Sequence, residues 1–203
     1  INGMVYMRGS PQDYDDWAAA GCTGWGWDRI GRHFVALEDH QLGAGEWRGV
    51  GGPLRVSRHP AGNPLCAAII DAARQMGVPT VEDVNDVAAV ADQGFGYQTL
   101  STYKGQRFSA ARAFLDPVRK RPNLDILSGA QASRILFEGK RASGLCLGER
   151  TVLCRGEIIL SAGAVETPKL LETSGIGDGA RLQALGIATV AHSPGVGENL
   201  REY

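Results

Sequence analysis

The stretch SAGAVETPKLLETSGIGDGARLQALGI, residues 161–187, decides the fold that the sequence predicts. Residues 157–160 just before it, EIIL, predict a buried strand. Residues 168–173 predict a helix, with Thr167 as its N-cap and a proline in its first turn. A strand that leads through small residues into a helix is typical of α/β folds, so the sequence predicts a mixed α/β protein.

Two clusters of small residues in this stretch are candidate cofactor sites. The second cluster, GIGDGA at Gly175–Ala180, matches the G-x-G-x-x-G/A pattern of dinucleotide-binding turns. That pattern needs a strand directly before its first glycine, whereas the preceding residues predict a helix. The glycines are therefore interpreted as the end of that helix. An NAD-dependent dehydrogenase that uses Gly175–Ala180 remains the alternative, and Glu198 follows at roughly the spacing of its ribose-binding carboxylate.

The first cluster, Ser161, Ala162 and Gly163, has the more favourable position. It follows the predicted strand and precedes the predicted helix, which is where open α/β sheets bind ligands. Small side chains allow a cofactor to approach the backbone there, but they equally allow the helix to pack closely on the strand. The residues alone leave both interpretations open.

The composition is that of a globular protein and excludes some classes of partner. Of 203 residues, 43% are hydrophobic and 21% are charged, and the formal net charge is -1, so no basic field attracts a nucleic acid. No segment has the ~20 apolar residues of a transmembrane helix and no secretory signal is visible, so a cytoplasmic location is expected. No metal site is predicted, because metal-ligand spacing is absent from the cysteines Cys22, Cys66, Cys146 and Cys154.

The rest of the chain predicts helices in its first half and short strands in its second. The helix at residues 64–76 has the clearest signals, with Asn63 at its cap and Gly77 after its end. Residues 104–105 centre a predicted hairpin. Further helices are expected at residues 13–20, 28–37 and 109–116, and an antiparallel meander between residues 123 and 160.

Residues 163–177, GAVETPKLLETSGIG, resemble the second signature of the glucose-methanol-choline (GMC) oxidoreductases. The matching positions are the small residues, Thr167-Pro168, Leu170-Leu171 and the final SGIG. Further segments similar to landmarks of that family follow one another in the same order: INGMVYMRGSPQDYDDWAAAG, GWGWD, GGPLRVS, QGFGYQ, FSAARAFLDP, RPNLDIL, ILFEGKRASG and PGVGENL. The resemblance spans the whole chain, and choline-dehydrogenase-like members of the family look most similar.

The resemblance implies part of a doubly wound FAD-binding domain interleaved with a substrate domain of antiparallel sheet and helices. It also implies that the FAD fingerprint lies before Ile1 and that the active-site histidine lies beyond Tyr203, so no catalytic residue is expected within the chain. The implied segments are 1–45 associated with the FAD domain, 46–120 in the substrate domain, 121–195 in the FAD domain and 196–203 at the start of a second substrate-domain segment.

The same resemblance implies an FAD-dependent alcohol dehydrogenase or oxidase. In the intact family the histidine deprotonates the alcohol and a hydride moves from its carbon to flavin N5. The implied partners are FAD, a small-molecule alcohol and an electron acceptor, either oxygen or a quinone-like molecule. The fragment by itself is expected to be inactive, to lose most affinity for FAD and to expose apolar surface that favours self-association. A folded module without catalysis remains an alternative.

Seven residues have implied contacts with FAD. The segment at residues 2–4 resembles the one beside the isoalloxazine, where backbone N–H groups stabilise negative charge on the reduced flavin. Residue 132 stands where the family's backbone meets the adenine, and residues 161–163 resemble the strand end near the adenosine half. The seven are Asn2, Gly3, Met4, Ala132, Ser161, Ala162 and Gly163.

Overall fold

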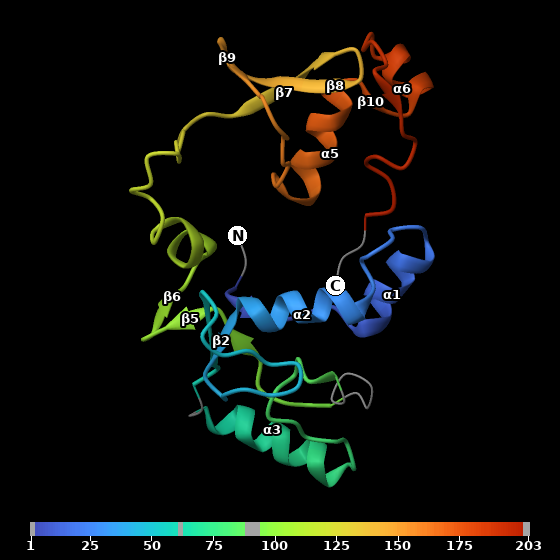
Figure 1. Cartoon of the computed structure of the whole chain (residues 1–203). Helices are drawn as coiled ribbons and strands as arrows, with labels where there is room; N and C mark the ends of the chain where they lie inside the picture. The colour runs from blue at the N-terminus through green and yellow to red at the C-terminus, as the bar shows by residue number, and fades with distance from the viewer. Residues whose placement is uncertain (1–2, 61–62, 88–93, 201–203) are drawn as a thin grey trace. The chain divides into compact units, whose positions relative to one another are not determined.

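The computed structural model describes residues 3–60, 63–87 and 94–200. These residues form two compact units, one within Ile1–Leu124 and the other within Asp125–Tyr203 (Figure 1). Each unit contains both helices and strands, so the predicted mixed α/β class is confirmed. The division into four interleaved segments stays a prediction.

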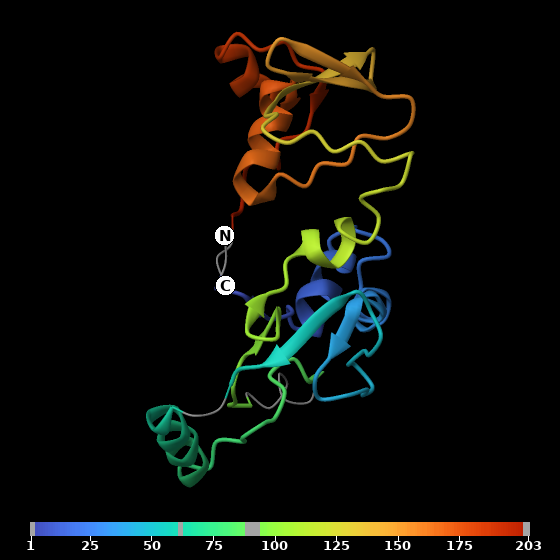
Figure 2. The same cartoon turned by 90° about the vertical axis from the view of Figure 1, so that its left-hand side faces the viewer.

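A mixed sheet lies in the first unit, and Figure 2 shows two of its strands, β3 in cyan and β2 in blue, side by side. β4 is antiparallel to both β1 and β3, whereas β2 is parallel to β3. β1 is therefore an edge strand, and its ladder with β4 covers only two residues. The order of the sheet is β1 (Val5–Tyr6), β4 (Thr99–Leu100), β3 (Leu54–Arg58) and β2 (Glu38–His40).

Two of the predicted helices, α1 (Pro11–Ala19) and α2 (Trp27–Leu37), pack against each other. Ser10 and Asp13 start α1 with a capping box, in which each side chain bonds the backbone N–H of the other. The sequence predicted both helices to within about two residues, the usual uncertainty of helix ends.

Aromatic side chains fill the space beside α2. The rings of Trp27 and Trp47 have centroids 5.1 Å apart, and Tyr14 and Phe34 contact Trp27 as well. Gly31 of α2 lies directly under this cluster, because an added Cβ would be 2.6 Å from the Trp47 ring. This packing, formed by residues far apart in the sequence, holds the loop that contains Trp47 against α2.

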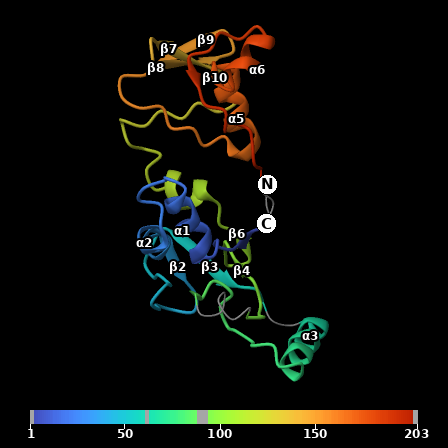
Figure 3. The same cartoon turned by 90° about the vertical axis from the view of Figure 1, so that its right-hand side faces the viewer.

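Helix α3 (Pro64–Gln75) lies at the margin of the first unit (Figure 3). The side chain of Asn63 accepts a hydrogen bond from the Leu65 amide at 3.0 Å, as an N-cap does. Gly77 follows the helix with φ +80°, a conformation that glycine adopts without strain. The predicted cap and stop of this helix are confirmed.

The predicted hairpin is also present. β5 (Thr102–Tyr103) and β6 (Gln106–Arg107) are antiparallel, and the two residues between them have φ of 50° and 73°. Two consecutive left-handed residues are typical of the tight turns that join such strands. The helix expected at residues 109–116 is a single π-helical turn, η1 (Ala111–Leu115).

An antiparallel meander forms the main sheet of the second unit, as predicted. Gly139 and Gly148 occupy its two turns with φ of 61° and 62°. Helix α5 (Gly163–Thr173) packs against the first strand. The strands are β7 (Ala132–Glu138), β8 (Arg141–Leu147) and β9 (Arg150–Leu153).

Ser174 joins the end of α5 to β7. Its hydroxyl accepts from the Ile135 amide at 2.8 Å and donates to the Leu170 carbonyl at 2.5 Å. Gly175 follows with φ +91°, so the predicted helix end is confirmed. Because α5 and not a strand precedes this glycine, the alternative of an NAD site at Gly175–Ala180 is wrong. The remaining elements are β10 (Ile176–Gly177), α6 (Gly179–Ala184) and β11 (Ala191–His192), with β10 parallel to β11.

The strand predicted at residues 157–160 is not formed. Within the described chain no strand pairs with this segment, and Ile159 is 83% exposed. A strand is stable only when a neighbour bonds its backbone N–H and C=O groups. The apolar pattern could not show whether such a neighbour is present.

The predicted start of α5 is also wrong. The helix begins at Gly163, so Pro168 lies inside it and not in its first turn. Thr167 is not the N-cap, and its hydroxyl accepts from the Ala162 amide at 3.1 Å. Proline is favoured in a first turn because no N–H is needed there. In α5 the residues before Pro168 form an additional helical turn, although Pro168 cannot donate the backbone hydrogen bond of its position.

Candidate cofactor site

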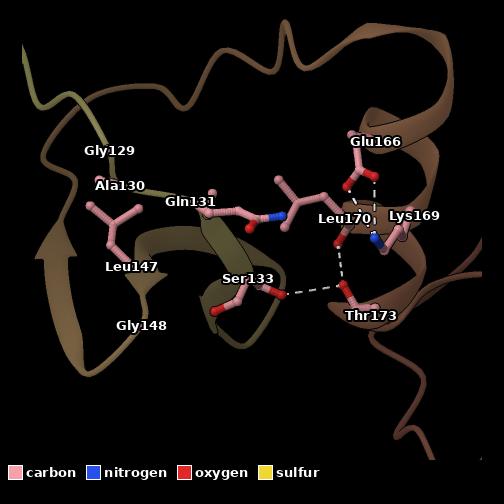
Figure 4. Close-up of a pocket in the computed structure, with 11 residues that line it drawn as sticks. Gly129, Ala130, Gln131, Ser133, Leu147, Gly148, Glu166, Lys169, Leu170 and Thr173 are labelled. Atoms are coloured by element: carbon pink, nitrogen blue, oxygen red, sulfur yellow. Dashed lines mark hydrogen bonds and ion pairs between the residues drawn. The ribbon is translucent and has the colours of Figure 1, made fainter.

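A cavity of about 480 Å³ lies between β7, the turn after β8 and one face of α5 (Figure 4). Figure 4 shows the side chain of Gln131 extending from the start of β7 toward Leu170 on the helix. The cavity is lined by Gly129, Ala130, Gln131, Ala132, Ser133, Leu147, Gly148, Glu166, Lys169, Leu170 and Thr173.

The backbone at the start of β7 is irregular where it borders the cavity. Ala132 pairs with Leu147, and the register then shifts before Arg134 pairs with Cys146. Such a bulge takes backbone groups out of the regular ladder, and bulges are common beside binding sites. Ala132 has a small side chain, so a ligand can approach the main chain here. The structure thus places this predicted adenine-contact residue in the wall of a cavity.

The remaining lining combines apolar faces with a few polar groups. Leu147 and Leu170 supply apolar surface, and Gln131 supplies both an amide donor and an acceptor. Lys169 and Glu166 form an exposed ion pair at 3.2 Å on α5. Apolar walls with a few hydrogen-bonding groups are typical of sites for flat heterocycles such as a purine.

Ser161, Ala162 and Gly163 do not line this cavity. They are exposed and lie at the start of α5, the helix whose later turns form the cavity wall. Gly163 has φ +93°, and an added Cβ would meet nothing within 4 Å. The backbone of these residues is therefore accessible, as a contact with the adenosine half would require. The sequence predicted a sheet edge at these residues, but no strand precedes them, and the first residue of α5 that lines the cavity is Glu166.

The other predicted FAD segment belongs to the first unit. Asn2 lies outside the described residues. Gly3 is exposed, and Met4 has φ +70°, which is uncommon for a residue with a side chain. The Met4 carbonyl accepts from the amide and the hydroxyl of Ser101, at 2.8 and 3.2 Å. The backbone of this segment is thus held in a strained conformation by the residue that follows β4.

A buried charged cluster of Tyr6, Arg8 and Glu38 lies at β1, and no sequence pattern predicted it. Arg8 bonds Glu38, which also accepts from the Tyr6 hydroxyl at 2.7 Å and from the Gly49 amide at 3.1 Å. Arg8 donates to the Trp47 carbonyl as well, at 2.6 Å. The side chains of Arg8 and Glu38 are only 3% and 0% exposed, so this ion pair is almost completely removed from water.

The cluster shifts the pKa values of its members. Burial raises the pKa of Tyr6 far above its usual value, and the charge and hydrogen bond of Glu38 add to this, so Tyr6 remains a neutral donor. Burial by itself would lower the pKa of Arg8, but Glu38 outweighs it through a hydrogen bond and opposite charge. The net pKa of Arg8 is raised, and the residue stays a cation.

His40 lies next to this cluster and is 4% exposed. Its Nδ1 accepts from the Leu42 amide at 3.1 Å, so the ring proton is on Nε2, which lies 3.7 Å from Asp83 Oδ2. Burial lowers the pKa of His40, Asp83 and Glu38 oppose the shift, and two arginines, Arg48 and Arg8, reinforce it. The imidazole is therefore neutral near pH 7.

Neither a metal site nor a membrane-spanning helix is found within the described ranges 3–60, 63–87 and 94–200. No group of histidine, cysteine, aspartate or glutamate side chains there could hold a metal ion. No helix in those ranges is long and apolar enough to cross a membrane. All four cysteines of the sequence lie in them and are free thiols.

The fold is shared with flavin-dependent oxidoreductases of one family. The profile of the family described as GMC oxidoreductase matches residues 1–203, and the chain belongs to this family. The predicted family is confirmed.

Relatives that the chain matches over its whole length include choline dehydrogenases. It is 41% identical to "Choline dehydrogenase, mitochondrial" of Homo sapiens, with 100% of this chain and 34% of that protein covered. It is 40% identical to "Oxygen-dependent choline dehydrogenase" of Brucella anthropi, with 100% and 37% covered. The chain thus spans about a third of the length of the curated relatives it matches.

Solved structures show the same fold. Pyridoxine 4-oxidase from Mesorbium loti has a TM-score of 0.84 and 37% identity, covering 95% of this chain and 38% of that chain. An FAD-dependent oxidoreductase from Chaetomium thermophilum has a TM-score of 0.87 and 35% identity, covering 100% and 38%. At these identities both the fold and the family are shared.

Proposed function

We propose that this chain is part of an FAD-dependent enzyme that oxidises the CH–OH group of a small alcohol, and that its β7–α5 cavity holds the adenine of FAD. The observation that carries the proposal is the cavity at Ala132. It has small residues in its lining, apolar faces from Leu147 and Leu170, and an irregular main chain. These features fit a planar, hydrogen-bonding ring system such as adenine.

The chain's own residues would bind and orient the cofactor. Bound FAD would supply the hydride acceptor for alcohol oxidation. Ala132 would offer its main chain to the adenine, and residues 161–163 would lie near the adenosine half. The amides of Gly3 and Met4 would face the isoalloxazine and stabilise negative charge there. Asn2 belongs to the same proposal but lies outside the described residues. The proton-accepting histidine is expected beyond Tyr203.

The names of the relatives support a choice of substrate and acceptor. Two of the relatives are choline dehydrogenases, one of them oxygen-dependent, and a further structural relative with a TM-score of 0.79 is a formate oxidase. We therefore infer an alcohol of the amino-alcohol type as substrate and molecular oxygen as the acceptor, with a quinone-like acceptor as the alternative. A cytoplasmic location stays a prediction, since one relative is named mitochondrial.

Self-association of the isolated chain also stays a prediction. Several apolar side chains are largely exposed, which supports it: Leu153 (76%), Ile159 (83%) and Met76 (81%).

The test is FAD binding by the full-length protein and by a variant that fills the cavity. Ala132→Tyr places a ring in the proposed adenine site and should weaken FAD binding at least tenfold, about 1.4 kcal/mol. Ala180→Tyr is the matched control, because Ala180 is an exposed residue of the same unit on α6. Affinity is measured by the quenching of flavin fluorescence on titration. Alcohol-dependent bleaching of the bound flavin, followed without oxygen, tests the oxidation.

Two results would contradict the proposal. One is a full-length protein that binds no FAD. The other is FAD affinity that is equal in Ala132→Tyr and Ala180→Tyr, which would exclude the cavity as the adenine site while leaving the family assignment intact.

A further inference from the structure

The chain continues past the end of β1 without a neighbouring strand. Its ladder with β4 covers Val5 and Tyr6, and the described chain from Met7 to Ser10 belongs to no strand. The backbone at Arg8 is nevertheless buried, because Arg8 is only 9% exposed, whereas Met7 before it is 57% exposed. Its N–H and C=O groups therefore need other partners.

The side chain of Asn85 provides these partners. Its Oδ1 accepts from the Arg8 amide at 2.8 Å, and its Nδ2 donates to the Tyr6 carbonyl at 3.0 Å. These two backbone groups flank Met7, and they are the pair that a neighbouring strand would bond. Nδ2 also donates to Thr99 Oγ1 at 2.9 Å, and that hydroxyl donates to the same Tyr6 carbonyl at 2.7 Å. A side-chain amide thus replaces the peptide group of a missing strand.

Asn85 is itself held in place. It is 6% exposed, and its backbone N–H donates to Asp83 Oδ1 at 3.0 Å. The other carboxylate oxygen of Asp83 accepts from Arg48 at 3.1 Å. Three of the four hydrogen bonds available to the Asn85 side chain are made. Asn85 is thus bonded on one side to the chain at β1 and on the other to Asp83, which is itself bonded by Arg48.

Met4, the residue with a positive φ, directly precedes β1. A side-chain-bearing residue with positive φ costs about 1–3 kcal/mol and persists only where the surroundings hold it. Ser101 bonds the Met4 carbonyl, and Asn85 bonds the chain two and four residues further along, at Tyr6 and Arg8. The two anchors together define the direction in which the Gly3 and Met4 amides point.

We propose that Asn85 is a positioning residue, which clamps β1 so that the Gly3 and Met4 amides keep their orientation toward the flavin. The inference rests on the proposed function, since it assigns the flavin to that segment. Asn85 is not expected to touch substrate or cofactor, and it acts only through the backbone of β1. Loss of the Asn85 side chain should therefore displace the Gly3 and Met4 amides, which would change the absorption and the reduction potential of the bound flavin.

The first measurement tests the clamp in the protein without reference to flavin. In Asn85→Ala the Arg8 amide loses its acceptor, so hydrogen exchange in the segment from Met4 to Arg8 should become up to about tenfold faster. Asn63→Ala is the matched control. It removes the same side chain from the same unit, where it caps α3, and should speed exchange in α3 only.

The second measurement tests the consequence in the flavin-loaded full-length protein. In Asn85→Ala the flavin absorption bands should shift and the reduction potential should fall, because the reduced flavin loses stabilising donors. In Asn63→Ala both should match the unmodified protein. If Asn85→Ala does not fold, Asn85→Asp replaces it, since it keeps the acceptor for the Arg8 amide and loses the donor to the Tyr6 carbonyl.

The outcomes separate the two proposals. Faster exchange from Met4 to Arg8 together with a lower flavin potential supports the positioning role of Asn85. Unchanged exchange, or faster exchange with an unchanged flavin, overturns that role and leaves the proposed function standing. Absence of flavin from the unmodified full-length protein overturns the proposed function and this inference with it.

Discussion

The buried carboxylate of Glu38 is the point at which the stability of the first unit can be tested most directly. It is fully buried and accepts hydrogen bonds from Arg8, Tyr6 and the Gly49 amide. Glu38→Gln keeps the size of the side chain and an acceptor oxygen, but it removes the negative charge. Arg8 is then left as a buried cation without its carboxylate.

The expected loss of stability is large. Removal of one partner from a buried ion pair costs about 3–5 kcal/mol, a large share of the free energy of unfolding of a typical domain. With a denaturant dependence of about 2 kcal/mol per molar urea, the midpoint of unfolding should fall by about 1.5–2.5 M. Asp71→Asn is the control, because the Asp71–Arg74 pair is 60% and 61% exposed and should contribute less than about 1 kcal/mol.

Tryptophan fluorescence during urea unfolding measures this effect in the relevant unit. The double variant Arg8→Met with Glu38→Gln removes both charges, so it should be more stable than Glu38→Gln alone. The signal reports only the first unit, because every tryptophan of the chain lies in it: Trp17, Trp25, Trp27 and Trp47.

Either of two results would refute this reasoning. The midpoint of Glu38→Gln could fall no further than that of Asp71→Asn. Alternatively, the loss of stability in the double variant could equal the sum of the losses in Arg8→Met and in Glu38→Gln. That result would mean that the charges of Arg8 and Glu38 do not stabilise one another.

Two further predictions concern a buried histidine and a buried hydroxyl. Burial lowers the pKa of His40 below its usual 6.5, so as pH falls below that value the unfolded chain takes up the proton first and the first unit loses stability. His40→Asn keeps an acceptor for the neighbouring amide and should weaken this pH dependence, measured as urea midpoints at about pH 7.5 and about pH 5.5; an equal dependence in both proteins would contradict it. Ser174→Ala leaves the Ile135 amide without its acceptor and should lower the stability of the second unit by about 1–3 kcal/mol. Thermal unfolding followed by circular dichroism checks this, and an unchanged midpoint would count against the proposed joint between α5 and β7.

Local signals were sufficient wherever the partners of a residue lie close in the sequence. Asn63 caps a helix two residues away, and Gly77 ends it. Gly139 and Gly148 turn the meander, and Gly175 ends α5. Each of these structures depends on a few consecutive φ values and on hydrogen bonds within one turn, so the residue types predict them directly.

The candidate site was predicted only in part. The family resemblance pointed to Ala132, and the structure places that residue in the wall of the cavity. Residues 161–163 lie outside the cavity, and the strand expected before them is absent. An apolar run shows that a segment is suited to burial, but whether it becomes a strand depends on a partner elsewhere.

By itself, the sequence determined the family, the mixed α/β class and most helix ends and turns, because these follow from short motifs and local backbone preferences. Only the tertiary structure decided which polar groups meet behind β1. Arg8 and Glu38 are 30 residues apart in the chain, and Arg8 and Asn85 are 77 apart. No periodicity connects such residues. They meet because folding buries Arg8 just after β1, where the described chain forms no strand, and buried backbone groups and charges must then find partners.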